Sequence, residues 1–383
     1  MGSKTVPSDD RYGRPLSVHL VLVWNDFTST GVLRKVQETV TTWTSLGVHV
    51  RASLVSRDPR AHDWAKSLGE TSHPWCADAW TYRSPLTLNA TMRACLRHGV
   101  PDEVDVIYSR FDLFLPSLAV RTRSTPLVLE VNSNLHQELA RVRSASAIYR
   151  RATFGLTKSV AAGITFVSNE LCASRDFADY RGARTVIANG IDLASVAPAA
   201  RPEAVLGRPR AAFIGSPNQP WHGVDKIVWL ARQRPSWTFD IIGEEAPSTS
   251  VPDNVTFHGV LRRDAYTSLL QAADVAFGTL ALHRKGMHEA SPLKVREYLA
   301  LGVPTIIGYQ DTDIDADTAW LLSLPNQESN VKDNVERIDR FVAEWRGRRV
   351  PRDELAMIDI RTKEERRLAF FREVVARRGT ERS

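Results

Sequence analysis

Short apolar runs alternate with longer stretches of helical periodicity along most of the chain. The stretch Gly31–Leu46 has the apolar spacing of a helix and follows the first such run. In the first half, the β-branched runs that predict buried strands are Val18–Val23, Val48–Val55, Val104–Tyr108, Pro126–Val131, Gly163–Val167 and Thr185–Ala188. Strands separated by helical segments predict a parallel sheet with crossover helices.

An Ala- and Pro-rich segment from Asp192 to Arg210 interrupts the alternation and predicts a linker. The pattern then restarts, with helical spacing at Val224–Arg232 and Ala265–Ala272. The predicted strands of this half are Ala211–Ile214, Phe239–Ile242, Val255–Phe257, Val275–Phe277 and Thr305–Ile307. The pattern therefore predicts the α/β class, with two doubly wound, Rossmann-like domains.

The length of 383 residues also favours more than one domain. We expect a flexible tail over residues 1–15, an N-terminal domain over 16–195 and a C-terminal domain over 196–365. The spacing of Leu368, Phe371 and Val375 predicts an amphipathic terminal helix over 366–383.

Composition changes this picture little. The net charge of +6 favours anionic partners, but 44 acidic residues are interleaved with 50 basic ones and no nucleic-acid-binding motif occurs. We therefore expect no nucleic acid partner. The polar N-terminus lacks the apolar core of a signal peptide, and no apolar run is long enough for a membrane span. Cys76, Cys95 and Cys172 show no pairing or metal spacing, so we predict a cytoplasmic, reducing location.

The segment Gly286–Thr305 (GMHEASPLKVREYLALGVPT) carries the clearest chemistry. Ser291 is a suitable N-cap and Pro292 suits the first helical position, while Gly302 and Pro304 predict the end of the helix. The start of a helix presents unpaired N–H groups that suit phosphate. Lys294, in the first turn, opposes the helix dipole and therefore favours a bound anion such as a diphosphate.

Glu289 and Glu297, with seven residues between them, stand on either side of this helix start. One lies before the helix and the other nearly two turns inside it, so their carboxylates are not expected to be neighbours. Together they can bracket an extended ligand and accept hydrogen bonds from hydroxyl groups at both of its ends. A nucleotide sugar has hydroxyls at both ends and a diphosphate between them.

The Glu289-x7-Glu297 spacing resembles the signature of retaining GT-B glycosyltransferases of family GT4. Two further stretches agree in the expected order. Val186–Asp192 (VIANGID) resembles the motif that closes the N-terminal domain, and Phe213–Asp225 (FIGSPNQPWHGVD) resembles the motif that opens the C-terminal domain. Asn189 and Gly190, within the first of these, predict a turn between the domains.

The resemblance implies site roles and a terminal helix that packs back on the N-terminal domain. Glu297 would bind the donor ribose, Glu289 the hydroxyls of the transferred sugar, and Lys294 the diphosphate. His136 is the candidate for the histidine near the sugar, so the catalytic candidates are Glu289, Lys294 and His136. The donor-binding candidates besides Glu297 are Gly31, Gly215, Ser216, His222, Lys226, Gly243, Ala290, Ser291, Pro292 and Leu293.

The chain departs from the family at a basic pair. Ser216 and His222 stand where many relatives have arginine and lysine, so Lys226 or Lys294 would have to compensate. We expect no cofactor and no metal requirement, because the helix dipole and Lys294 can stabilise a phosphate leaving group. The aspartates Asp311, Asp313 and Asp315 are predicted to lie in a loop rather than in a metal motif.

The predicted function is therefore retaining transfer of a hexose-like sugar from a nucleotide-sugar donor, a UDP-sugar first and a GDP-sugar next. The acceptor stays open among a glycan, a lipid-linked sugar and a small natural product. A nucleotide-sugar epimerase or hydrolase of the same architecture and a non-catalytic sugar-nucleotide-binding protein are the alternatives. A dinucleotide oxidoreductase is disfavoured, because no G-x-G-x-x-G motif follows Val18–Val23.

One further stretch bears on location. Arg141–Lys158 has five basic residues interleaved with apolar ones such as Ile148 and Leu156. It predicts either a solvated helix or a surface that contacts the inner face of a membrane peripherally.

Overall fold

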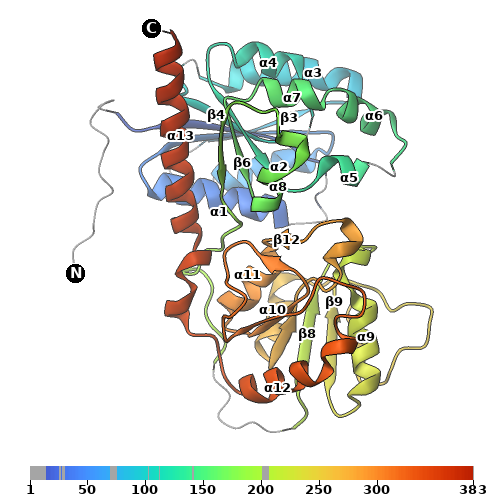
Figure 1. Ribbon diagram of the computed structural model, residues 1–383. Coiled ribbons are helices and arrows are strands. Elements are labelled where there is room, and N and C mark those ends of the chain that lie inside the picture. The colour runs from blue at the N-terminus through green and yellow to red at the C-terminus, as the bar shows by residue number, and fades with distance from the viewer. Residues whose placement is uncertain are drawn as a thin grey trace, which may run out of the picture.

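The computed structural model describes residues 14–25, 27, 31–69, 76–101, 103–111, 113–139, 142–200 and 207–382. It contains two parallel sheets, one in each half of the chain, and Figure 1 shows the two halves stacked one above the other. The predicted α/β class with two Rossmann-like domains is confirmed. Among the described residues, no helix has the length and apolar character needed to cross a membrane.

The N-terminal sheet has seven parallel strands in the order β3-β2-β1-β4-β5-β6-β7. Its strands are β1 Ser17–Val23, β2 His49–Ser56, β3 Cys76–Thr81, β4 Val106–Arg110, β5 Leu127–Val131, β6 Gly163–Phe166 and β7 Ala183–Val186. Its helices are α1 Gly31–Ser45, α2 Arg60–Gly69, α3 Pro85–Ala94, α4 Pro116–Arg121, α5 Leu135–Leu139, α6 Ala145–Ala152, α7 Phe154–Ser159 and α8 Asn169–Ala173. The strand order changes direction between β1 and β4, which is where ligands bind in open α/β sheets.

The C-terminal sheet has six parallel strands in the order β10-β9-β8-β11-β13-β15. Its strands are β8 Arg210–Ile214, β9 Thr238–Ile242, β10 Val255–Phe257, β11 Val275–Phe277, β13 Thr305–Ile307 and β15 Leu321–Ser323. Two short strands, β12 Glu289–Ala290 and β14 Gln310–Asp311, pair separately. Its helices are α9 Val224–Gln233, α10 Arg263–Gln271, α11 Leu293–Ala300 and α12 Val335–Trp345.

The sequence pattern misses four strands. β3 begins beside residues outside the described part, and its sequence (CADAWT) has few β-branched residues. Thr305–Ile307 was expected to end the second sheet, but β15 extends the edge of that sheet. β12 and β14 are two residues long, and only their pairing with each other defines them.

The last helix, α13 Ile360–Arg382, leaves the C-terminal domain and runs along the N-terminal domain (Figure 1). Its Phe371 is fully buried and packs edge-on against Trp43 of α1, with ring centroids 5.5 Å apart. Gly163 of β6 permits the close approach, because a side chain there would stand 2.8 Å from a methyl group of Val374. The helix also starts earlier than the predicted residue 366.

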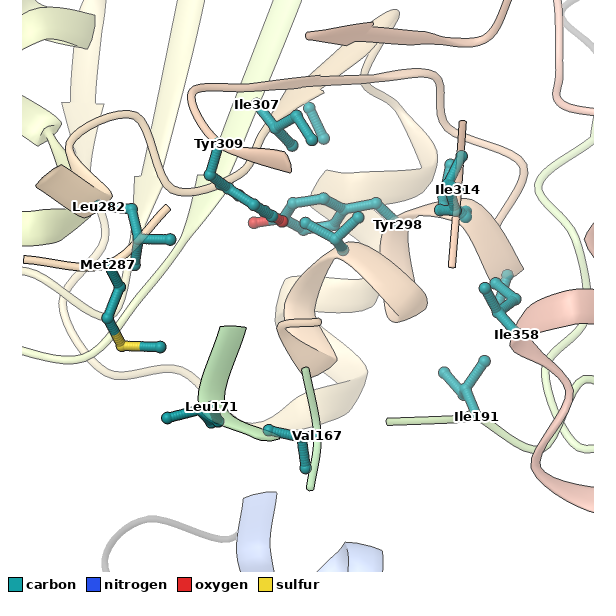
Figure 2. Packing of buried hydrophobic residues seen from close by; sticks show 14 of the residues in the cluster. Val167, Leu171, Ile191, Leu282, Met287, Tyr298, Ile307, Tyr309, Ile314 and Ile358 are labelled. Carbon is teal, nitrogen blue, oxygen red and sulfur yellow. The ribbon is translucent and has the colours of Figure 1, made fainter. Parts of the chain in front are cut away.

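Apolar packing continues from one domain into the other. Val167 and Leu171 of the N-terminal domain belong to the same buried cluster as Leu282 and Met287 of the C-terminal domain. Figure 2 shows these four side chains on facing elements at the junction. The segments that follow strands β6 and β11 therefore meet across this junction.

Candidate functional site

The carboxyl ends of both parallel sheets face the junction between the domains. Gly31 and Asn169 follow β1 and β6, and Gly215 and Gly243 follow β8 and β9. Helix starts and loops gather at such ends, where they can bind ligands. Gly31 in the N-terminal domain and Gly215 and Gly243 in the C-terminal domain therefore lie at the sheet ends that face this junction.

Helix α11 begins one residue later than predicted. Pro292 occupies the N-cap position and has no side-chain acceptor. The predicted capping role of Ser291 is wrong, because its hydroxyl donates to the carbonyl oxygen of Val167 at 3.1 Å and accepts from the backbone N–H of Asn189 at 3.1 Å. Ser291 therefore joins the two domains, and α11 starts without a side-chain cap.

Lys294 is a half-buried residue at this uncapped helix start. Its Nζ is shielded from solvent and has no hydrogen-bond partner among the described residues. It lies 4.4 Å from the centre of the Phe213 ring. Burial lowers the pKa of Lys294 to about 7, and the carboxylate of Glu244 opposes this shift. An ammonium group that is shielded from water and has so little compensation favours the binding of an anion.

His222 contacts the same Phe213 ring as Lys294, and the charge of Glu244 acts on Lys294. The His222 Nδ1 is 3.6 Å from a carboxylate oxygen of Glu244, and its ring packs edge-on against Phe213. Burial, with the charges of Lys294 and Lys285, lowers the pKa of His222 to about 2. The imidazole is therefore neutral near pH 7 and does not replace the positive charge of a lysine at this position.

Sequence reasoning did not identify Glu244. It directly follows the predicted Gly243, at the end of β9, so its position in the turn was the only signal. Gly243 has a φ of +85°, and a side chain there would collide with the carbonyl oxygen of Gly215 at 2.1 Å. The close crossing of these two turns thus requires glycine at position 243. Ser216, after Gly215, is exposed.

Glu297 is buried on α11 and contacts the N-terminal domain. Its carboxylate accepts hydrogen bonds from the Arg34 guanidinium at 3.1 and 3.5 Å and from the Tyr266 hydroxyl at 3.2 Å. Arg263 lies 3.5 Å away as a further ion-pair partner. Arg34 belongs to α1, so this ion pair crosses between the domains.

Glu289 caps a helix of the opposite domain. One of its oxygens accepts from the backbone N–H and side-chain amide of Asn169, both at 2.9 Å, and the other accepts from the backbone N–H of Glu170 at 2.7 Å. In return, the Glu170 carboxylate accepts from the backbone N–H groups of His288 and Glu289, both at 2.8 Å. We call this reciprocal pair the Glu170–Glu289 latch.

Gly31 is the first residue of α1 and faces α11. A side chain at Gly31 would lie 4.0 Å from a methyl group of Leu293. The start of α1 and the start of α11, with Ala290 just before it in β12, therefore approach each other across the junction. This arrangement places Gly31 near the region that Lys294 and Leu293 define.

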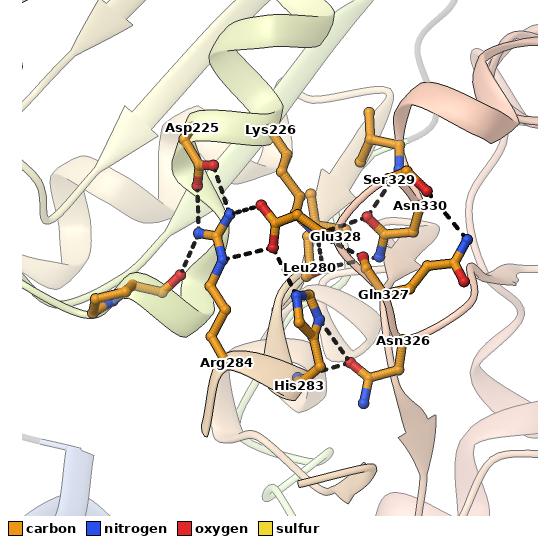
Figure 3. Close-up of polar contacts among 12 residues, drawn as sticks. Asp225, Lys226, Leu280, His283, Arg284, Asn326, Gln327, Glu328, Ser329 and Asn330 are labelled. Carbon is orange, nitrogen blue, oxygen red and sulfur yellow. Dashed lines mark hydrogen bonds and ion pairs between the residues drawn. The ribbon is translucent and has the colours of Figure 1, made fainter. Parts of the chain in front are cut away.

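Lys226 is occupied within the C-terminal domain. Its Nζ donates to the carbonyl oxygens of Leu280 and Gln327 and to the side-chain oxygen of Asn330, at 2.8–3.1 Å. Figure 3 shows it beside a second network, in which Arg284 binds both Asp225 and Glu328. A contact of Lys226 with a donor stays a prediction, and it would require three hydrogen bonds to be exchanged.

Arg296 forms a buried ionic cluster that the sequence did not indicate. Its guanidinium binds both oxygens of Asp311, at 2.6 and 2.8 Å, and Asp313 at 3.1 Å, and its Nε donates to the carbonyl oxygen of Asn189. Lys363 of α13 binds the other oxygen of Asp313 at 2.6 Å. Asp311 lies in β14 rather than in the predicted loop, and together with Asp313 it ties α11 to α13. Asn189 contacts the other domain, and the turn predicted at Asn189 and Gly190 does not form there.

The N-terminal side of the junction carries its own polar cluster. Lys35 of α1 donates to the Glu130 carboxylate at 2.8 Å, and Arg367 of α13 lies 3.2 Å from the same carboxylate. Lys35, Glu130 and Arg110 line a pocket under α1, at the point where the strand order changes direction. The side chain of His136 lies outside the described residues. In the part of the chain that the structure describes, no cluster of side chains suited to a metal ion occurs.

No protein-family model matches the sequence, and a search among curated proteins finds no match. Solved structures with the same fold cover nearly the whole chain. Sucrose-phosphate synthase from Thermosynechococcus elongatus has 16% identity and a TM-score of 0.66, over 94% of this chain and 99% of that one. A glycosyltransferase from Rickettsia africae has 11% identity and a TM-score of 0.65, over 95% and 99%.

A third structure, HepE of Anabaena in complex with UDP and glucose, has 13% identity and a TM-score of 0.59, over 91% and 98%. All three structures share the arrangement of two Rossmann-like domains. The chain has the GT-B fold. At such low sequence identity, the similarity establishes only the fold. The chemistry has to be inferred from the residues of the site.

Proposed function

We propose that this protein transfers a sugar from a nucleotide-sugar donor to an acceptor, with retention at the anomeric carbon. The observation that carries the proposal is Lys294: a shielded cation without a hydrogen-bond partner among the described residues, at the uncapped start of α11. A donor diphosphate supplies the missing anion, and the N–H groups of the α11 start supply further donors.

In this proposal the two glutamates divide the donor between them. Glu297 accepts the ribose hydroxyls in place of Arg34, and Glu289 accepts the hydroxyls of the transferred sugar in place of the α8 start. Both carboxylates are buried and already accept two or more hydrogen bonds, so each is arranged as an acceptor. Donor binding then exchanges contacts between the domains for contacts with the ligand.

Lys294 and the helix start would stabilise the leaving phosphate as the glycosidic bond breaks. Fixed dipoles and a positioned cation can do this without a divalent metal, so we propose no metal requirement. The Lys35–Glu130 cluster and Arg110 border the pocket where the N-terminal domain would hold the acceptor. A UDP-sugar is the first choice of donor, because UDP is bound in one neighbour of the same fold.

The test is a screen of UDP-, GDP-, ADP- and dTDP-sugars for donor consumption, with and without glycan, lipid-linked and small-molecule acceptors. Transfer requires product that contains the sugar, and its anomeric configuration decides between retention and inversion. Consumption or isomerisation without an acceptor would indicate an epimerase or hydrolase. Tight binding of a nucleotide sugar without turnover would indicate a non-catalytic binding protein. A Lys294→Met variant should lose donor consumption.

A further inference from the structure

Helices at the outer end of the N-terminal domain form a continuous surface, which we call the basic apolar face. It consists of α3 with the π-helical turn Cys95–Gly99, of α4, and of α6 with α7 (Figure 1). The Ser117 backbone N–H of α4 donates to the Asn89 side chain of α3 at 3.0 Å. The Tyr149 hydroxyl of α6 donates to the Phe114 carbonyl oxygen, just before α4, at 3.0 Å. These bonds hold the helices side by side.

Exposed apolar side chains concentrate on this face. Of the eight large apolar side chains that are exposed in the described part of the chain, six lie on or next to these helices: Leu86, Val120, Val142, Ile148, Tyr149 and Leu156. Leu86 is 93% exposed and Val120 62%, so they contribute almost nothing to the core. Single exposed apolar residues need no explanation, but a group on one surface indicates a contact with an apolar partner.

The same helices contain basic residues and no acidic ones. Residues 83–101, 113–129 and 142–169 include no Asp or Glu. Arg93, Arg97 and Arg143 are exposed there. Of the neighbouring acidic residues, Asp179 binds Lys158, while Glu103 is exposed. Acidic and basic residues alternate along the chain as a whole, so the absence of acidic residues from these three segments is specific to this surface.

An open groove runs between α3 and α4 within this face. Arg93 and Arg97 form one wall with Leu96, and Val120 and Arg121 belong to the other. The groove therefore combines an apolar surface with guanidinium groups at its rim. This combination fits the boundary between lipid headgroups and acyl chains.

We propose that the basic apolar face docks the N-terminal domain on an anionic lipid membrane. Arginines near an anionic surface are attracted to it, and the exposed apolar side chains enter the headgroup region. A nucleic acid would satisfy the guanidinium groups but would leave the six apolar side chains in water. Membrane docking requires neither the donor nor sugar transfer. The docking proposal can therefore fail while the proposed function holds, and the proposed function can fail while docking holds.

The test is co-sedimentation of the full chain with vesicles of phosphatidylglycerol and phosphatidylcholine, and with phosphatidylcholine alone. We expect binding to the anionic vesicles at roughly 0.02 M salt and at least a severalfold loss at about 0.5 M, where charges are screened. Arg93→Glu/Arg97→Glu should lower the partition coefficient at least tenfold. The control is Arg262→Glu/Arg348→Glu, which makes the same change in net charge at two exposed sites on the C-terminal domain. This control should alter the partition coefficient less than twofold.

The apolar contribution has its own pair of variants. Ile148→Ser/Leu156→Ser should weaken binding severalfold, whereas Val260→Ser, at an exposed site on the C-terminal domain, should not. Circular dichroism confirms that each variant is folded. Absence of binding to anionic vesicles at low salt would overturn the proposal, as would equal losses in the face and control variants. Binding that a single-stranded oligonucleotide abolishes, with no effect of the serine variants, would assign the face to nucleic acid instead.

Discussion

Lys294 and Glu297 are three residues apart on α11, yet each meets a different environment. The Lys294 ammonium group lies over the Phe213 ring and has no hydrogen-bond partner among the described residues. Glu297 accepts hydrogen bonds from Arg34 and Tyr266. The sequence spacing indicated both as ligand contacts, and the structure adds that one lacks a counter-ion in hydrogen-bond contact while the other already has one.

The first prediction concerns Glu297→Gln. The amide accepts fewer hydrogen bonds and carries no charge, so affinity for a free nucleoside diphosphate should fall by about 1.5–3 kcal/mol, measured by calorimetric titration. Arg34→Gln is the matched control, because it removes the same ion pair and leaves the carboxylate free for the ribose. The Arg34→Gln variant should bind the nucleoside diphosphate with unchanged or higher affinity. Equal loss in both variants, or none in folded Glu297→Gln, would remove Glu297 from the site.

The second prediction follows from the pKa of Lys294, which burial lowers to about 7. Above that pH the free protein has a neutral amine, whereas the diphosphate of a nucleotide sugar favours the charged one. Binding at about pH 8 should therefore take up a proton, and affinity should fall as pH rises, by up to roughly tenfold per unit. Titrations in buffers of different ionisation enthalpy measure the uptake. Binding at about pH 8 without proton uptake would contradict the proposed contact of Lys294 with the diphosphate.

The same shift has a consequence for stability without ligand. The folded-state pKa lies below the unfolded value of 10.5, so the unfolded chain binds more protons between pH 7 and 10.5. Lys294 therefore lowers the free energy of unfolding at and below pH 7, and this loss is relieved as pH rises through that window. Lys294→Met should raise the melting temperature near pH 7 and weaken its pH dependence there. Lys332→Met, at an exposed site, serves as the control.

At the scale of elements, the start of α8 and the strand β12 depend on each other. α8 is five residues long, and its first backbone N–H groups donate to a carboxylate from the other domain. Such a short helix gains little from its own hydrogen bonds, so a negative charge at its start contributes to its stability. The Glu170–Glu289 latch therefore acts as a contact between domains in the absence of donor.

The third prediction uses the symmetry of this latch. Glu289→Gln should weaken binding of the intact nucleotide sugar far more than binding of the free nucleotide, because Glu289 is assigned to the sugar. Glu170→Gln disrupts the same latch from its other side but has no assigned contact with the ligand. Calorimetry with both ligands compares them. If the two variants give the same pattern, Glu289 serves only to join the domains.

At the scale of the whole molecule, the chain returns from the C-terminal domain to complete the N-terminal one. Phe371, Leu368 and Val374 of α13 belong to the apolar core on the α1 side of the first sheet. Arg367 is also fully buried there and binds Glu130 and Glu364. The apolar core of the first domain is therefore complete only when α13 packs against it.

The fourth prediction tests this dependence. Phe371→Ala removes a buried ring between Trp43 and Tyr108 and should lower the free energy of unfolding by about 3–5 kcal/mol. Arg377→Ala, which loses an exposed ion pair with Glu373, should cost about 1 kcal/mol or less. Hydrogen exchange should locate the loss of protection in the N-terminal sheet. Loss confined to the C-terminal domain would contradict the assignment of α13.

The sequence pattern by itself determined the alternation of strands and helices, the two Rossmann-like domains and the helix that carries Lys294 and Glu297, while the GT-B arrangement was implied by the family resemblance. These features depend on local patterns, namely β-branched runs, helical spacing and stop signals within about twenty residues. Only the tertiary structure decided what each side chain contacts. Ser291 binds Asn189, Glu289 binds Asn169, and Glu297 binds Arg34, through pairings that bring distant segments to the ends of two sheets. A hydrogen bond between segments far apart in the chain leaves no periodicity in the sequence, and so no pattern could predict it.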